Sequence, residues 1–196
     1  GNTMVGLWMN HANAGGNVGL LKTRDGNIAL TGNASNAASN LGIAISSATI
    51  ESTGSGAISL TGLASTHAAH GLQLSGVNLL ALSGDTNLVN TSSAGSSLTL
   101  DNVTLGAKAG SDVPASRSNL LLQTDTLVTS GAPSRVNTSG TVTLQPDAAS
   151  FAAPLSMPTA MLALNSAVSG LTVGRIGNAA DITIDRPKNR DHGDWA

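Results

Sequence analysis

The sequence predicts an all-β fold of the β-solenoid type, in which short parallel strands stack coil upon coil. An eight-residue phrase with aliphatic residues at shared positions occurs three times, at Ile43–Ile50, Leu72–Leu79 and Leu98–Leu105. A second phrase, Gly26–Gly32, returns 30 residues later as Gly56–Gly62. Apolar and polar residues alternate within both phrases, as they do in half-buried strands. Repeats of this length are typical of stacked units that bury their apolar faces only against their neighbours.

Each copy of the first phrase predicts two short strands joined at a corner. Ile43 and Ile45 point to one face of a strand and Ala44 to the other, because side chains alternate along an extended chain. The pair Ser46-Ser47 interrupts this alternation before Ala48 resumes it, and small polar residues suit such a turn. The second phrase supplies a further strand between glycines. The residues expected to form the core stack are Ile28, Leu30, Ile43, Ile45, Ile50, Ile58, Leu60, Leu72, Leu74, Leu79, Leu98, Leu100, Leu105, Val142, Leu144, Ile182 and Ile184.

Weaker echoes extend the repeat towards both ends, in coils of about 22–30 residues. Gly16–Leu20 and Gly140–Leu144 echo the second phrase, and residues 181–184 keep the alternation. Leu120–Leu127 is expected to continue the first phrase. Residues 158–169 are the only segment that suits a short helix.

The chain is expected to form one structural unit. Residues 1–184 form a single β-solenoid segment, and residues 185–196, which are rich in charge, form a disordered tail. A β-sandwich is the alternative fold, since short strands with regular turn signals also suit it. The hydrophobic content of 40% argues against disorder of the whole chain, because disordered chains lack the residues for a core.

Composition limits the partners of this chain. The formal net charge is −2 and no basic cluster occurs inside the repeats, so we expect no nucleic-acid partner. The absence of cysteine excludes a disulfide framework and is compatible with export. No stretch approaches 18 apolar residues, which predicts a chain that does not span a membrane.

Few residues suggest a ligand site. His67 and His70 could hold a metal ion, but no cysteine or glutamate lies near them in sequence, so we interpret them as loop histidines. Gly15–Thr23 resembles a phosphate-binding loop except that Leu21 stands where a glycine is needed. We therefore expect no metal and no cofactor. The N-terminal group Leu7, Trp8 and Met9 is expected to form core or cap.

Catalysis is not predicted either. The candidate carboxylates for an enzyme acting on polysaccharide share no repeat position, and they are Asp85, Asp101, Asp112 and Asp125. The stretched loop Gly106–Ser118 is where binding is expected, with three charged residues that could contact a partner or face solvent: Lys108, Asp112 and Arg117. Four Asn-x-Ser/Thr sequons, which permit glycosylation, begin at Asn33, Asn90, Asn102 and Asn137.

Three stretches of the C-terminal half, residues 119–127, 137–146 and 170–184, resemble the filamentous-haemagglutinin-like large exoproteins of Gram-negative bacteria. The most specific wording is SGTVTLQP in the second stretch and GLTVGRIGNAADITI in the third. The resemblance covers roughly residues 26–184. The chain departs from the family in having no Asn-Pro dipeptide, which is typical of the family's N-terminal secretion domain. It therefore resembles the shaft repeat region of these two-partner secretion adhesins.

The resemblance implies a right-handed parallel β-helix that is exported through an outer-membrane partner transporter. It also implies a secreted or cell-surface location and a non-catalytic role as a shaft or spacer in adhesion to host cells or other bacteria. A host or bacterial surface receptor would then be the second partner. Two alternatives stay open, namely a polysaccharide-active β-helix enzyme and an autotransporter passenger fragment.

Overall fold

The computed structural model describes residues 4–10, 19–34, 40–64, 70–92, 97–157 and 161–184, and within them all regular structure is β-strand. Most strands form three parallel sheets, A, B and C, in which every third strand along the chain is hydrogen-bonded to the next. Sheet A contains β1 (Met4–Asn10), β4 (Asn40–Ser46), β7 (His70–Ser75), β10 (Ser97–Asp101) and β13 (Thr126–Thr129).

Sheets B and C each contain six strands. Sheet B is formed by β2 (Gly19–Thr23), β5 (Ala48–Ser52), β8 (Asn78–Ala81), β11 (Thr104–Gly106), β14 (Ser134–Asn137) and β17 (Leu162–Leu164). Sheet C is formed by β3 (Ile28–Ala34), β6 (Ile58–Ala64), β9 (Thr86–Ser92), β12 (Leu120–Gln123), β15 (Thr141–Gln145) and β18 (Gly170–Val173). A two-stranded sheet D pairs β16 (Leu155–Met157) with β19 (Ile182–Ile184).

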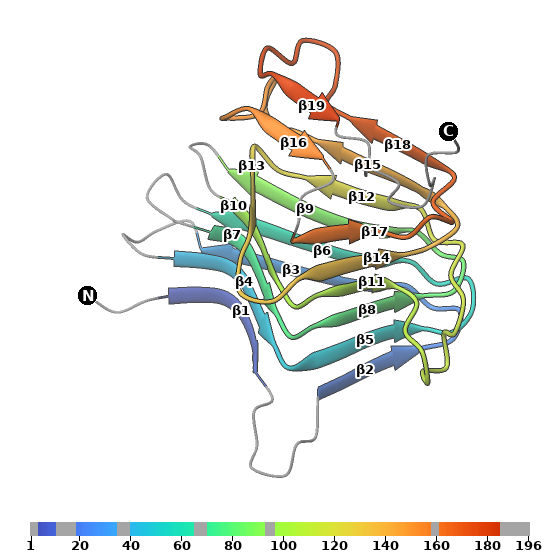
Figure 1. Ribbon diagram of the computed structural model, residues 1–196. Coiled ribbons are helices and arrows are strands. Elements are labelled where there is room, and N and C mark those ends of the chain that lie inside the picture. Colours follow the sequence, from blue (N-terminus) through green and yellow to red (C-terminus); the bar gives the residue numbers. More distant parts are fainter. Residues whose placement is uncertain are drawn as a thin grey trace, which may run out of the picture.

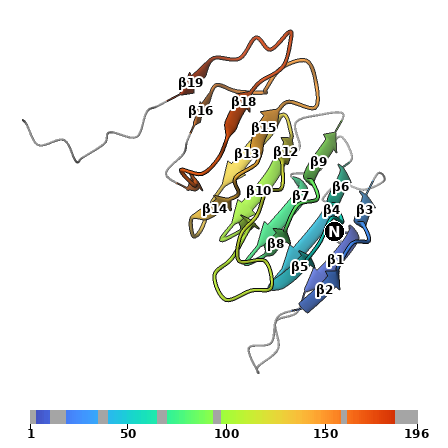
Figure 2. The same cartoon turned by 90° about the vertical axis from the view of Figure 1, so that its right-hand side faces the viewer.

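The chain visits sheets A, B and C in turn and rises by one strand at each circuit, which gives a β-solenoid of about five turns. In Figure 1 it runs along sheet A and then sheet B across the near side and returns along sheet C behind them. Figure 2, seen from the right, shows sheet B on one side and sheet C on the other. A path that crosses the near side from left to right while climbing is right-handed, the hand that parallel crossover connections prefer. The predicted fold class is confirmed.

The repeated phrases stack in register, as the sequence predicts. Ile43 pairs with Leu72, and Leu72 with Leu98, so that the three copies of the first phrase lie on consecutive strands of sheet A. In sheet C, Ile28 pairs with Ile58 and Gly32 pairs with Gly62. Because equivalent residues stack on consecutive strands, each aliphatic side chain can pack against two others of similar shape. This arrangement suits a core that contains almost no aromatic residues.

The core consists of these stacks. Of the residues expected in it, fourteen are at most 8% exposed: Ile28, Ile43, Ile45, Ile50, Ile58, Leu60, Leu72, Leu74, Leu79, Leu98, Leu100, Leu105, Val142 and Leu144. Leu30 and Ile182 are partly buried and pack against the others. Ile184 is 54% exposed, so its expected place in the core is wrong. The reason is that β19 has a hydrogen-bonded neighbour on only one side among the described strands.

Three other expectations about segments are also wrong. Leu120–Gln123 does not continue the first phrase but forms β12 of sheet C, and Leu127 pairs with Leu98 instead. Within residues 158–169, the described part contains the strand β17 and no helix, because Leu162 and Leu164 are used to pair with β14. Gly19 and Leu20, expected to echo the second phrase, lie in β2 of sheet B.

Coil length varies more than the expected range of about 22–30 residues. Paired residues lie 22 apart between Leu122 and Leu144, but 34 apart between Leu88 and Leu122 and 36 apart between Met4 and Asn40. The expected tail, residues 185–196, lies outside the described residues. No described helix is long and apolar enough to cross a membrane.

Candidate functional site

Two of the aspartates considered for catalysis, Asp101 and Asp125, hold turns of neighbouring coils. Asp101 Oδ1 accepts a hydrogen bond from the amide nitrogen of Ala132 at 2.9 Å, and Asp125 Oδ1 accepts one from that of Ala148 at 2.7 Å. Asp85 Oδ1 accepts a hydrogen bond from the side-chain amide of Asn119, in the following coil, at 3.1 Å. Each carboxylate bonds a different partner, so their positions are accounted for by the need to satisfy polar groups at the turns.

The stretched loop in which binding is expected lies against sheet B. Residues 107–118, which we call the sheet B cover, descend over the outer face of that sheet, as the segment between β11 and β12 in Figure 1 shows. Val113, which belongs to the cover, is fully buried. Ser116 Oγ donates to the carbonyl oxygen of Ala81 at 2.6 Å, and the amide of Arg117 donates to that of Leu82 at 2.7 Å. More than half of the residues of the cover, including Lys108 and Arg117, nevertheless face solvent.

One charged cluster lies at the edge of the sheet B cover. Lys22 Nζ donates a hydrogen bond to Asp112 Oδ2 and lies 3.9 Å from Glu51 Oε1. The hydrogen bond to Asp112 is the main cause that raises the pKa of Lys22 above its usual 10.5. Glu51 is 5% exposed, and its Oε1 has no hydrogen-bond partner. The cluster ties the cover to β2, but its ammonium occupies the space between the two carboxylates.

The histidine pair does not supply a metal site that the structure describes. His67 lies outside the described residues. His70 Nδ1 lies 2.6 Å from Ser97 Oγ and 3.0 Å from Thr99 Oγ1. Hydrogen bonds to these hydroxyls therefore satisfy this ring nitrogen. Across the described part of the chain, no three histidine, aspartate or glutamate side chains are grouped to hold a metal ion.

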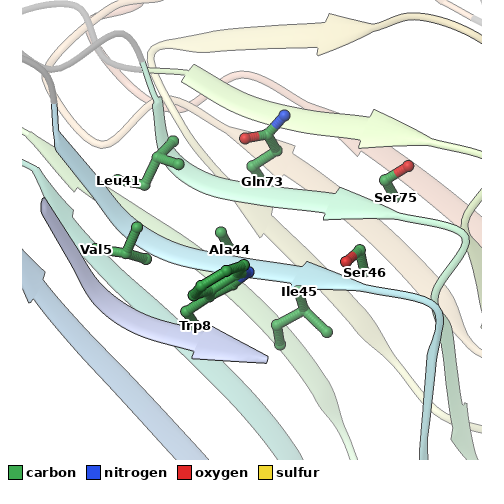
Figure 3. Close-up of a pocket in the computed structure, with 8 residues that line it drawn as sticks. All are labelled: Val5, Trp8, Leu41, Ala44, Ile45, Ser46, Gln73 and Ser75. Atoms are coloured by element: carbon green, nitrogen blue, oxygen red, sulfur yellow. The ribbon is translucent and has the colours of Figure 1, made fainter. Parts of the chain in front are cut away.

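The candidate site is a groove of about 480 Å³ on the outer face of sheet A, which we call the sheet A groove. It crosses β1, β4 and β7 (Figure 3), and its lining residues are Val5, Trp8, Leu41, Ala44, Ile45, Ser46, Gln73 and Ser75. Trp8 is the most exposed of the large apolar residues in it, at 70%. Its expected role as core or cap is therefore wrong, whereas Leu7 and Met9 do pack against the core.

Register and two glycines explain how the groove forms. Trp8 pairs with Ala44, and Ala44 pairs with Gln73, so one outward row contains an indole, a methyl group and an amide. The small Ala44 leaves room beside the ring, which projects across β4 in Figure 3. Gly6 faces sheet C at close range. A Cβ atom added to it would lie 2.3 Å from the backbone nitrogen of Asn33 in β3. The equivalent Gly42 meets Leu63 in the same way.

The chemistry of the groove is that of a neutral, half-apolar surface. Apolar carbon lines one end, around Val5 and Leu41, the Gln73 amide lies in the middle row with Trp8 and Ala44, and the hydroxyls of Ser46 and Ser75 lie at the other end. The two hydroxyls pair in register on adjacent strands. None of the eight lining residues is titratable. An exposed ring beside a few donors and acceptors is the usual composition of a small-molecule subsite.

The four sequons differ in accessibility. Asn33 and Asn102 are exposed, at a strand and at a corner. Asn90 is 1% exposed and donates to Thr124 Oγ1 at 3.0 Å, and Asn137 donates to the carbonyl oxygen of Ala107 at 3.0 Å. The folded chain therefore offers two of the four to a modifying enzyme.

No protein-family model matches this chain, and no curated protein and no solved structure matches it either. The resemblance to filamentous-haemagglutinin-like exoproteins therefore stays a prediction from the sequence.

Proposed function

We propose that this chain is a non-catalytic structural and adhesive segment of a secreted or surface-displayed bacterial exoprotein, and that the sheet A groove contacts neutral saccharides. One observation carries the proposal. Trp8 presents a 70% exposed indole on a parallel sheet whose adjacent outward positions are Ala44 and Gln73. An exposed ring of this size beside a groove offers apolar area that a bound ligand can cover.

A neutral saccharide fits the groove's chemistry better than a charged ligand. The apolar face of a sugar ring can lie against the indole, while its hydroxyls can exchange hydrogen bonds with the Gln73 amide and the hydroxyls of Ser46 and Ser75. A phosphate or sulfate group would need a cation, and the lining residues provide none. The binding expected from so small a set of contacts is weak for one sugar and grows when several copies act together.

The solenoid suits a shaft or spacer. Each coil adds about 4.8 Å of length at constant cross-section, since the coils repeat at the spacing of hydrogen-bonded strands. Export through an outer-membrane partner transporter and contact with a host or bacterial receptor are supported by the sequence resemblance alone. They form part of this proposal on that basis.

A polysaccharide-active enzyme is the alternative that uses the same groove. Glycoside hydrolysis generally employs a pair of carboxyl groups flanking the bond to be cleaved. The lining residues include no acid. The nearby Asp101 is the register partner of Ser75 on β10, and its carboxylate accepts hydrogen bonds from Ser75 Oγ and from a turn amide. This arrangement favours binding without cleavage.

The experiment measures binding of the purified chain to a panel of immobilised neutral oligosaccharides, with sulfated and sialylated ones as contrast. Trp8→Ala is expected to lower binding at least tenfold, and Gln73→Ala severalfold, since one neutral hydrogen bond contributes about 0.5–1.5 kcal/mol. Leu20→Ala is the matched control, because Leu20 is a 62% exposed apolar residue of the same coil outside the groove. Its binding is expected to equal that of the unchanged chain.

Two results would overturn the proposed site. One is binding that Trp8→Ala leaves intact, which would place the contact elsewhere. The other is a preference for the sulfated or sialylated glycans that weakens steeply with salt, since that is the behaviour of a charged site.

A further inference from the structure

The side chain of Gln73 forms no hydrogen bond within the described part of the chain, unlike amide side chains at comparable outward positions of sheets B and C. On sheet C, Gln145 Nε2 donates to Gln123 Oε1 at 3.0 Å. On sheet B, Asn78 Nδ2 donates to Thr49 Oγ1 at 3.2 Å. Each of these amides bonds a polar residue of the adjacent coil, whereas the Gln73 carboxamide keeps both a donor and an acceptor for other partners.

The register of sheet A explains why Gln73 has no partner. Its neighbours on the two adjacent strands are Ala44 and Thr99. The side chain of Ala44 has no polar atom to offer. The hydroxyl of Thr99 is already engaged, since its Oγ1 lies 3.0 Å from His70 Nδ1 and 3.2 Å from Ser97 Oγ. A half-buried amide in this situation is hydrogen-bonded to water, which a ligand group of matching polarity can replace.

The sheet A groove places apolar carbon next to this free amide. Leu41 on the neighbouring strand β4, and its register partner Val5 on β1, line the groove together with Gln73. Trp8 and Gln73 lie two strands apart with Ala44 between them, so about 10 Å separates their backbones. Seen from the indole in Figure 3, the carboxamide lies beyond Ala44. This span suits one sugar ring that carries a short substituent.

We propose that the sheet A groove selects sugars that carry an acetamido group, the N-acetylhexosamines, over the corresponding plain hexoses. The N–H and C=O of an acetamido group can pair with the Gln73 carboxamide. Its methyl group can then lie on Leu41 while the sugar ring lies against the Trp8 indole. A plain hexose has only a hydroxyl at that position, which leaves part of the carboxamide unpaired and Leu41 uncovered. The inference rests on the proposed saccharide function and names the class of sugar that the same groove takes.

The test compares immobilised sugars, at equal density, that differ only in the acetamido group. One pair is the β1,4-linked trisaccharides of N-acetylglucosamine and of glucose, and the other is N-acetylgalactosamine and galactose. In at least one pair the unchanged chain is expected to bind the acetamido member about tenfold more tightly, because it gains two neutral hydrogen bonds and a methyl contact. Gln73→Ala is expected to bring this ratio within about twofold of one. Because the ratio compares two ligands on one variant, a loss of folded protein lowers both bindings and leaves the ratio unchanged.

Gln123→Ala is the matched control, since Gln123 is a half-buried glutamine of sheet C outside the groove. It is expected to keep the preference of the unchanged chain. Equal binding of both members of each pair would overturn the inference and leave the proposed saccharide function standing. A preference that persists in Gln73→Ala would also overturn it, because the acetamido group would then be recognised elsewhere. Binding to no neutral saccharide at all would contradict the proposed function itself, and this inference with it.

Discussion

Ser47 and Asn102 adopt the same left-handed backbone conformation at the same corner of the solenoid, with φ of 51° and 53°, two coils apart. Gly76 occupies this corner in the coil between them, with φ of 62°. The corner amides are hydrogen-bonded from coil to coil, Ser47 to the Ser75 carbonyl at 3.0 Å and Gly76 to that of Asp101 at 2.9 Å. The stack therefore imposes one conformation on three different residues.

Replacing Gly76 by alanine is expected to lower the free energy of unfolding by about 1 kcal/mol, because an L-residue is strained at positive φ. Steric clash contributes little, since the nearest atom to the added Cβ is 3.8 Å away. Urea unfolding followed by circular dichroism measures the change. Ser47→Gly is the matched variant, for which relief of strain and added chain entropy nearly cancel. Equal stability of Gly76→Ala and the unchanged chain would contradict this account of the corner.

Leu79→Ala is expected to lower the free energy of unfolding by about 2–5 kcal/mol, the usual cost of a cavity in a packed core. Leu79 is 0% exposed and lies between Ile50 and Leu105 in the sheet B stack. Leu20→Ala, at a 62% exposed position, is expected to change it by less than about 0.5 kcal/mol. The same urea titrations compare the two variants, and similar losses in both would show that the inward and outward faces are wrongly assigned.

Glu51→Leu is expected to raise the free energy of unfolding by about 1 kcal/mol. The Glu51 carboxylate is buried with an unbonded Oε1, and its ion pair with Lys22 is long, at 3.9 Å. Its register neighbour Leu80 is already a buried leucine, so an aliphatic side chain suits the site. Removing a poorly compensated buried charge is commonly neutral or stabilising. A clear loss of stability, measured by thermal and urea unfolding, would mean that the carboxylate is needed.

The ion pair between Lys22 and Asp112 is expected to fail at high pH. The pKa of Lys22 in the folded chain lies above its usual 10.5, so the pair's contribution to stability is fully present below pH 10.5. It is lost as the pH rises through the folded-state pKa. The difference in unfolding free energy between the unchanged chain and Lys22→Met should therefore shrink above that pH. A gap that persists at high pH would contradict the assignment.

The register of the core was predictable because it depends on local repetition. Ile43, Leu72 and Leu98 share one phrase, and chains that repeat a phrase satisfy the same backbone and packing demands in each coil. The assignment of Leu120 failed because the sheet B cover is inserted before it, which delays the next strand of sheet A to Thr126. A gapless comparison of phrases cannot detect such an insertion when the inserted residues are themselves small and polar.

The sheet A groove could not be predicted from the sequence in the same way. Its residues come from three strands that are far apart in the chain, and alternation alone would turn Val5 and Leu7 to the same face. The close approach of Gly6 to Asn33 breaks that alternation, which is a tertiary effect. The one local signal was Trp8, a large ring placed between two apolar residues that both face inward.

The central claim, an in-register parallel stack, is tested most directly by cross-linking engineered cysteine pairs, because the chain has no cysteine of its own. Ser59 and Asn87 are register partners on neighbouring strands of sheet C, whereas Ala29 lies one strand further from Asn87. The expected thiol separations are about 5 Å for Ser59→Cys with Asn87→Cys and about 10 Å for Ala29→Cys with Asn87→Cys. A short bifunctional thiol reagent should link the first pair within one chain and leave the second unlinked. Linking of the second pair in preference to the first, or of neither, would contradict the solenoid.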